Sequence, residues 1–125
     1  MKKFQGLSLS ILFLSLISTA ALAMPSTVIL IRHAEKTKDK ENIHLSAKGY
    51  ERAAALPSFF KKHSAAPLIR LVAQGQKHSE SSLRPIETLI PSSKEFKTEI
   101  NHQFVKDEAK EMVSHLVSST ALNKK

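Results

Sequence analysis

The sequence predicts an α/β domain in which a parallel sheet is flanked by helices. Two short apolar runs, at 27–31 and 68–73, are typical of buried strands. A segment with helical spacing of its apolar residues follows each run. The chain has 125 residues, which favours a single domain. Strands that alternate with helices in this way favour parallel pairing through right-handed crossovers.

The first half of the chain predicts one strand and one helix. Residues 27–31 are short, rich in β-branched side chains and not alternating, as in a fully buried strand. The charged stretch at 35–44 predicts a loop. Ser46 is a good N-cap for a helix that runs to about Lys62. Because proline cannot donate a backbone hydrogen bond, we expect a kink or a break at Pro57.

The second half repeats the pattern. The strand at 68–73 is followed by a polar loop at 74–82 and a helix from Leu83 to about Ser92, with Pro85 in its first turn. A short third strand is expected within 97–104, and a last amphipathic helix from Asp107 to near Leu122. No strand follows this helix, so we expect the sheet to lack its later strands.

The N-terminal segment at 1–23 predicts a secretory signal peptide. It has two lysines, an apolar run of 11 residues from Leu7 to Ile17, and an A-x-A cleavage signal ending at Ala23. A membrane span needs about 20 apolar residues, so an uncleaved anchor is the weaker alternative. We therefore expect a domain at 24–125 with no stable membrane anchor, located in the periplasm or secreted.

Composition narrows the function classes. The chain has no cysteine, which excludes disulfides and a lipid-modified N-terminal cysteine. Loss of Lys2 and Lys3 with the signal peptide lowers the formal charge from +8 to +6. This positive balance suits anionic substrates such as phosphate esters. One tyrosine, no tryptophan and no basic stripe with aromatic residues argue against nucleic-acid binding.

Arg32 and His33 are the first candidate site residues, because they directly follow the apolar run at 28–31. Open α/β sheets bind ligands at the carboxyl ends of their strands. An imidazole can attack phosphorus while a guanidinium holds the phosphoryl oxygens. Such a pair can also be an ordinary part of a polar loop.

Arg84 is the second candidate, because it opens the helix that follows the second predicted strand. The free N–H groups of a helix start favour anions. Arg32 and Arg84 would then bracket one phosphoryl group, with His33 between them. We expect Glu87 and Thr88 to support this pocket rather than to react.

Three ordered segments of the chain resemble the histidine phosphatase superfamily, the phosphoglycerate-mutase-like enzymes. They are residues 28–36 (VILIRHAEK), 45–49 (LSAKG) and 82–88 (SLRPIET). The resemblance implies the family's three-layer α/β fold and a transient phosphohistidine on His33. It also implies that Arg32 and Arg84 hold the phosphoryl group of a small phosphorylated substrate, with no metal and no cofactor.

The resemblance implies a carboxylic acid that protonates the leaving group. Glu108 is the preferred candidate and Asp107 lies beside it, whereas Glu35 is the weaker alternative. A carboxylate that only caps a helix is an equally good interpretation of Glu108.

The family also has a second catalytic histidine at the end of a later strand, and no apolar strand ending in histidine follows residue 92. His102 and His115 match that position poorly. Three hypotheses therefore stay open. They are an exported phosphatase for phosphate monoesters, a truncated and inactive family member that binds phosphate-like anions, and a cationic interaction module. The sequence does not set the oligomeric state.

Overall fold

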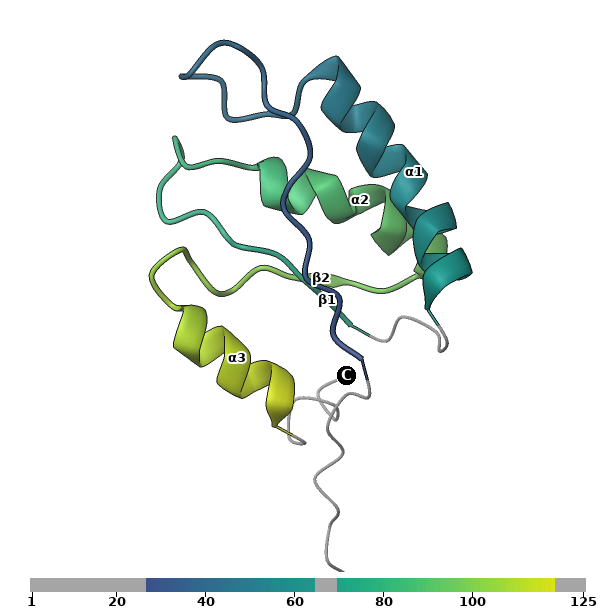
Figure 1. Ribbon diagram of the computed structural model, residues 1–125. Helices are drawn as coiled ribbons and strands as arrows, with labels where there is room; N and C mark the ends of the chain where they lie inside the picture. Colours follow the sequence, from purple (N-terminus) through teal and green to yellow (C-terminus); the bar gives the residue numbers. More distant parts are fainter. Residues whose placement is uncertain (1–26, 65–69, 119–125) are drawn as a thin grey trace, which may run out of the picture.

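The computed structural model describes residues 27–64 and 70–118 (Figure 1). In chain order the elements are α1 (Ala47–His63), β1 (Leu71–Val72), α2 (Arg84–Phe96), β2 (Ile100–Asn101) and α3 (Ala109–Val117). β1 and β2 pair in parallel, with Leu71 opposite Ile100 and Val72 opposite Asn101. The described chain therefore has a mixed α/β class, as predicted. The predicted signal peptide at 1–23 lies outside the described residues.

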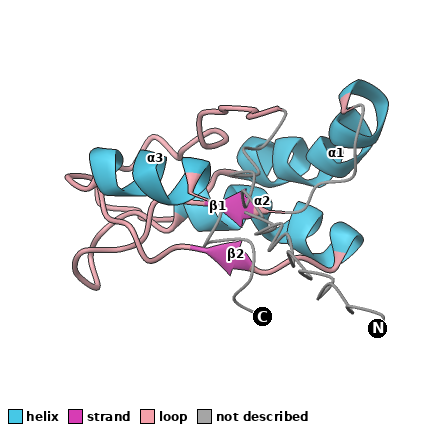
Figure 2. Cartoon of the chain, turned by 90° about the horizontal axis from the view of Figure 1, so that it is seen from below, coloured by secondary structure: helices cyan, strands magenta, loops and turns pink. Residues whose placement is uncertain are grey.

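The helices lie around the small sheet. α2 connects β1 to β2, packs against α1 and contacts β2 (Figure 1). α3 lies at the opposite end of the molecule from α1 (Figure 2). One apolar cluster, defined by Leu71, Ala73 and Leu89, joins the sheet to α2. A second cluster, defined by Ala34, Leu45 and Ala53, joins α1 to the segment that precedes it.

α1 begins and ends close to its predicted limits. The Ser46 hydroxyl accepts a hydrogen bond from the Gly49 N–H at 3.1 Å, which confirms the predicted N-cap. Pro57 lies inside the helix and does not break it. Ala53 before the proline and Phe60 after it are both buried, so packing on each side keeps the helix continuous.

α2 starts as predicted, with Pro85 in its first turn, but it extends past Ser92 to Phe96. Pro91 lies inside the helix and does not end it. Ser92 is fully buried, so the packed face of the helix continues through it. The helix ends where Lys97 adopts a left-handed conformation with φ of 50°.

The prediction of a buried strand at 27–31 is wrong for the described chain. No strand is formed there, and Val28 and Leu30 are 60% and 89% exposed. Only Ile31 packs against the cluster of Leu71, Ala73 and Leu89. Burial of such a strand needs a hydrogen-bonded neighbour and helices over both faces. Within the described residues, this segment crosses the strands without joining their ladder (Figure 1).

The other predicted elements are present with shifted ends. β1 occupies the end of the predicted 68–73 strand, whose residues 68 and 69 lie outside the described residues. β2 confirms the short third strand, and 74–82 is a loop. α3 begins at Ala109 rather than Asp107 and ends at Val117, before the predicted limit near Leu122, because Ser118 is already extended. In the described part of the chain, no helix is long and apolar enough to cross a membrane.

Candidate active site

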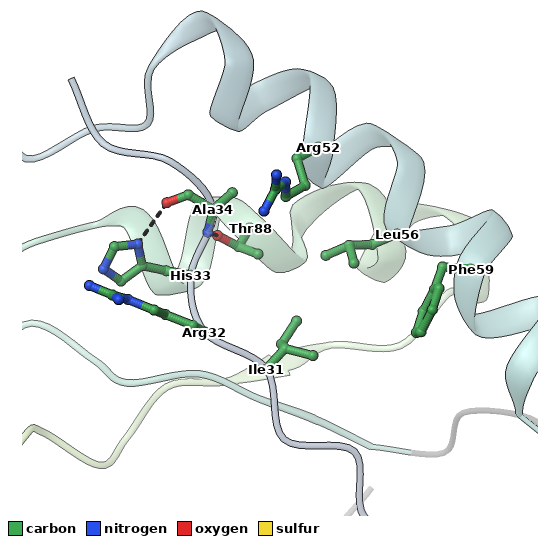
Figure 3. A pocket seen from close by; sticks show the side chains of 8 residues that line it. All are labelled: Ile31, Arg32, His33, Ala34, Arg52, Leu56, Phe59 and Thr88. Atoms are coloured by element: carbon green, nitrogen blue, oxygen red, sulfur yellow. Dashed lines mark hydrogen bonds between the residues drawn. The ribbon is translucent and has the colours of Figure 1, made fainter.

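Residues 31–34 and one side of α1 enclose a hollow of about 370 Å³ (Figure 3). Arg32 and His33 lie together at one end of it, and Leu56 and Phe59 lie at the other. Arg52 reaches into the same hollow from α1. The structure thus brings two of the predicted site residues together and adds a second guanidinium. The lining residues are Ile31, Arg32, His33, Ala34, Arg52, Leu56, Phe59 and Thr88.

The orientation of His33 is set by the backbone of the next residue. Nδ1 of the ring lies 2.7 Å from the carbonyl oxygen of Ala34 (Figure 3). A carbonyl oxygen can only accept, so Nδ1 carries the proton and donates it. In the neutral ring the lone pair is then on Nε2. A histidine nucleophile needs such a free ring nitrogen.

The backbone beside His33 is attached to α2 through Thr88. The Thr88 hydroxyl accepts from the Ala34 N–H at 2.9 Å and donates to the Arg84 carbonyl oxygen at 2.7 Å. Thr88 is only 2% exposed. These bonds hold the 31–34 segment at the start of α2, which is the supporting role expected for Thr88.

Glu87 joins three parts of the structure. Its carboxylate accepts hydrogen bonds from the Leu45 N–H at 2.9 Å and the Tyr50 hydroxyl at 3.1 Å, and lies 2.5 Å from Nδ1 of His44. Burial raises the pKa of Glu87, but the bonds from His44, Leu45 and Tyr50 outweigh it, so its pKa lies below the ordinary value. Burial and then the hydrogen bond to Glu87 raise the pKa of Tyr50. Glu87 is therefore a structural carboxylate.

Glu35 holds both the start of α1 and Arg52. Its carbonyl oxygen accepts from the Ser46 N–H at 2.8 Å and from the Ser46 hydroxyl at 3.1 Å. Its Oε1 forms an ion pair with Nη2 of Arg52 at 2.6 Å. The other carboxylate oxygen is buried and has no hydrogen-bond partner in the described part of the chain. Sequence reasoning missed Arg52, although it lies one helical turn after Gly49 on the side of α1 that meets Glu35.

Arg84 does not line the hollow. One of its terminal nitrogens, Nη1, donates to the carbonyl oxygen of Asn42 at 2.8 Å, which fixes the loop before α1. Its Nε is buried without a hydrogen-bond partner among the described residues. A buried N–H without an acceptor is costly.

Glu108 and its neighbour Asp107 are also outside this hollow. Glu108 is exposed at the start of α3, and its Oε2 accepts from the Val105 N–H at 3.0 Å. Asp107 pairs with Lys77 at 3.1 Å and lines a second hollow, of about 300 Å³, near the carboxyl ends of β1 and β2. The geometry supports the interpretation of Glu108 as a local helix-start carboxylate.

The other described histidines are not in the hollow of His33. His102 is exposed after β2, and His115 of α3 lies against Phe104, with ring centroids 5.3 Å apart. His115 also has Nε2 3.2 Å from the Asn101 amide nitrogen. In the described ranges, no three His, Asp or Glu side chains are grouped so as to hold a metal ion.

Comparison of the chain with models of protein families, with curated proteins and with solved structures found no match. The resemblance carried by residues 28–36, 45–49 and 82–88 therefore remains a prediction. A proposal of function for this chain therefore rests on the residues of the candidate site and on their geometry.

Proposed function

We propose that this chain is a histidine-phosphatase-like protein that hydrolyses phosphate monoesters through a phosphohistidine on His33. The proposal includes the family's three-layer, phosphoglycerate-mutase-like fold. The observation that carries it is the hydrogen bond between Nδ1 of His33 and the Ala34 carbonyl oxygen. This bond leaves the lone pair of the neutral ring on Nε2, and the ring lies beside the Arg32 side chain (Figure 3).

The reaction has two steps. Nε2 of His33 attacks phosphorus, the bond from phosphorus to the ester oxygen breaks, and the alcohol departs as an alkoxide that takes up a proton. Water then attacks the phosphohistidine, the bond from phosphorus to nitrogen breaks, and inorganic phosphate leaves. Arg32 is the proposed phosphate ligand at the hollow, and Arg84, which lies outside it, is proposed as the second ligand from the resemblance. Glu108 is the proposed acid from the resemblance alone, because it does not line the hollow of His33.

A second function, phosphate binding without turnover, is favoured by a specific observation. Among the described residues, no carboxylate and no second histidine line the hollow. The guanidinium groups alone can bind an anion. The proposed ligand class, a small phosphorylated molecule, is the same for both functions.

Hydrolysis of p-nitrophenyl phosphate by the full chain separates the two functions. The matched variants are His33→Ala and His78→Ala, the second of which removes an exposed histidine of the 74–82 loop. Catalysis by His33 predicts hydrolysis that His33→Ala abolishes and His78→Ala retains. No hydrolysis, with phosphate binding that Arg32→Ala weakens, indicates the binding function. Hydrolysis that persists in His33→Ala contradicts the proposed mechanism.

We also propose export of the chain, to the periplasm or the medium, after removal of 1–23. The intact mass of the native exported protein tests this proposal. A chain that begins at Met24 supports it, and one that retains residues 1–23 contradicts it.

A further inference from the structure

The second hollow, of about 300 Å³, lies between the two loops that follow the strands. The 74–82 loop follows β1 and residues 102–108 follow β2, and both lie on the left side of the molecule in Figure 1. Gly75 joins them, because its N–H donates to the Phe104 carbonyl oxygen at 2.8 Å and a Cβ there would clash with the His102 carbonyl oxygen. The hollow is thus at the carboxyl ends of two parallel strands, where α/β sheets bind ligands.

The 74–82 loop brings two hydroxyl groups with free protons to this hollow. The Ser81 hydroxyl accepts from the His78 N–H at 3.0 Å, and the Ser82 hydroxyl accepts from the Arg84 N–H at 3.3 Å. Neither hydroxyl donates to an acceptor among the described residues. A hydroxyl has one proton to donate besides its lone pairs, so each can still donate to a ligand.

The loop holds these hydroxyl groups in place before any ligand binds. The side-chain amide of Gln76 donates to the carbonyl oxygens of Ser79 at 3.3 Å and Ser81 at 2.7 Å. The Ser81 N–H donates to the His78 carbonyl oxygen at 2.9 Å, which closes the turn. Binding therefore requires little further ordering of this loop.

Two ammonium groups add to these donors. Nζ of Lys77 pairs with the Asp107 carboxylate at 3.1 Å, which joins the two loops at the hollow. The Ser81 hydroxyl lies beside the Lys77 backbone, because it accepts from the N–H of the next residue. Lys106 also lines the hollow and forms no ion pair among the described residues. With two lysines and one aspartate, the lining has a net positive charge.

We infer that the second hollow binds a phosphoryl group. Lys77 and Lys106 supply the positive charge, and lysine binds phosphate as a point charge. The hydroxyl groups of Ser81 and Ser82 donate to the phosphoryl oxygens. A phosphoryl group has several acceptor oxygens and no need of donors, which matches a lining rich in donors. This site uses none of the residues of the proposed reaction, so the inference goes beyond the proposed function.

Nuclear magnetic resonance of the ¹⁵N-labelled full chain locates the binding. Titration with inorganic phosphate at constant ionic strength is expected to shift the amide signals of 75–82 and 104–107 until they saturate. Sodium chloride at the same ionic strength screens charges equally and should not give this pattern. Methylphosphonate separates the sources of the group. Saturable shifts with both compounds indicate a phosphoryl group that can belong to a larger molecule, and shifts with phosphate alone indicate the free ion.

Three variants test the assignment of the ligands. Lys106→Gln should weaken phosphate binding at this hollow about tenfold, because a hydrogen bond to a charged group is lost. Asp107→Asn removes the carboxylate of the lining and should tighten binding about threefold. Lys110→Gln, at an exposed position of α3 outside the hollow, removes the same charge as Lys106→Gln and is the matched control. It should change the affinity by less than about twofold.

The failures are distinguishable. The inference is overturned if 75–82 and 104–107 show no saturable shift, if Lys110→Gln weakens binding as much as Lys106→Gln, or if Asp107→Asn weakens it. Shifts at Arg32 and His33 alone overturn the inference and leave the proposed function intact. Shifts at the second hollow alone support the inference and count against the proposed function.

Discussion

Replacement of Gly49 by alanine tests how closely α1 approaches the segment that carries His33. A Cβ at position 49 would lie 2.3 Å from the Glu35 carbonyl oxygen and 3.1 Å from the Leu45 Cβ. Ordinary contact begins near 3.4 Å, so the helix and the carbonyl must separate by roughly 1 Å. That carbonyl accepts both hydrogen bonds from Ser46, which the movement would lengthen.

The expected effect is a net loss of stability. Overpacking of a buried site costs about 1–3 kcal/mol, and loss of one hydrogen bond costs about 1 kcal/mol. Alanine stabilises a helix interior by about 1 kcal/mol relative to glycine, and this gain offsets the lost hydrogen bond. We therefore expect Gly49→Ala to lower the free energy of unfolding by about 1–3 kcal/mol.

Urea denaturation of the full chain, followed by far-UV circular dichroism, measures this change. Lys48→Ala, at an exposed position in the same helical turn, is the control and should change stability by about 0.5 kcal/mol or less. A Gly49→Ala variant as stable as the wild type, or more stable, would show that helix propensity alone acts there. That result would contradict the close contact between α1 at Gly49 and the Glu35 carbonyl oxygen.

Three further substitutions probe the supports of the site. Thr88→Val leaves the Ala34 N–H without its acceptor and should cost about 1–3 kcal/mol in urea denaturation, whereas an effect no larger than that of Thr37→Val would contradict this role. Ionised Glu87 stabilises the fold at pH values above the ordinary pKa of a glutamate. This contribution to stability is lost as the pH falls through the lowered pKa of Glu87 in the folded chain. The stability difference between wild type and Glu87→Gln should therefore be large at neutral pH and shrink in acid; a pH-independent difference would refute the assignment. Arg84→Lys keeps the charge but loses the forked donors, so phosphate binding should weaken about tenfold by calorimetry, and unchanged affinity would remove Arg84 from the phosphate ligands.

Features with local causes were predictable from the sequence. Ser46 caps α1 through its own hydroxyl, and Pro85 fits the first turn of α2 because that turn needs no N–H bond there. The parallel pairing of β1 and β2 follows from the helix between them. Arg32 and His33 share a hollow because they are adjacent in the chain and follow the apolar run.

Features that depend on distant neighbours were not predictable. The 27–31 segment has the composition of a buried strand, but its burial depends on neighbours that do not follow from its own residues. Arg52 enters the site only because α1 packs against Glu35. Arg84 bonds to the carbonyl oxygen of Asn42, 42 positions away in the sequence, and no local pattern encodes that contact.

Covalent labelling of His33 is the most direct test of the proposed mechanism. The full chain is mixed with p-nitrophenyl phosphate carrying radioactive phosphorus and quenched rapidly in alkali, in which phosphohistidine survives although acid hydrolyses it. We predict an acid-labile label on the peptide that contains His33, absent from His33→Ala and retained in His78→Ala. A label on any other residue, or one that persists in His33→Ala, would contradict a phosphohistidine at this position.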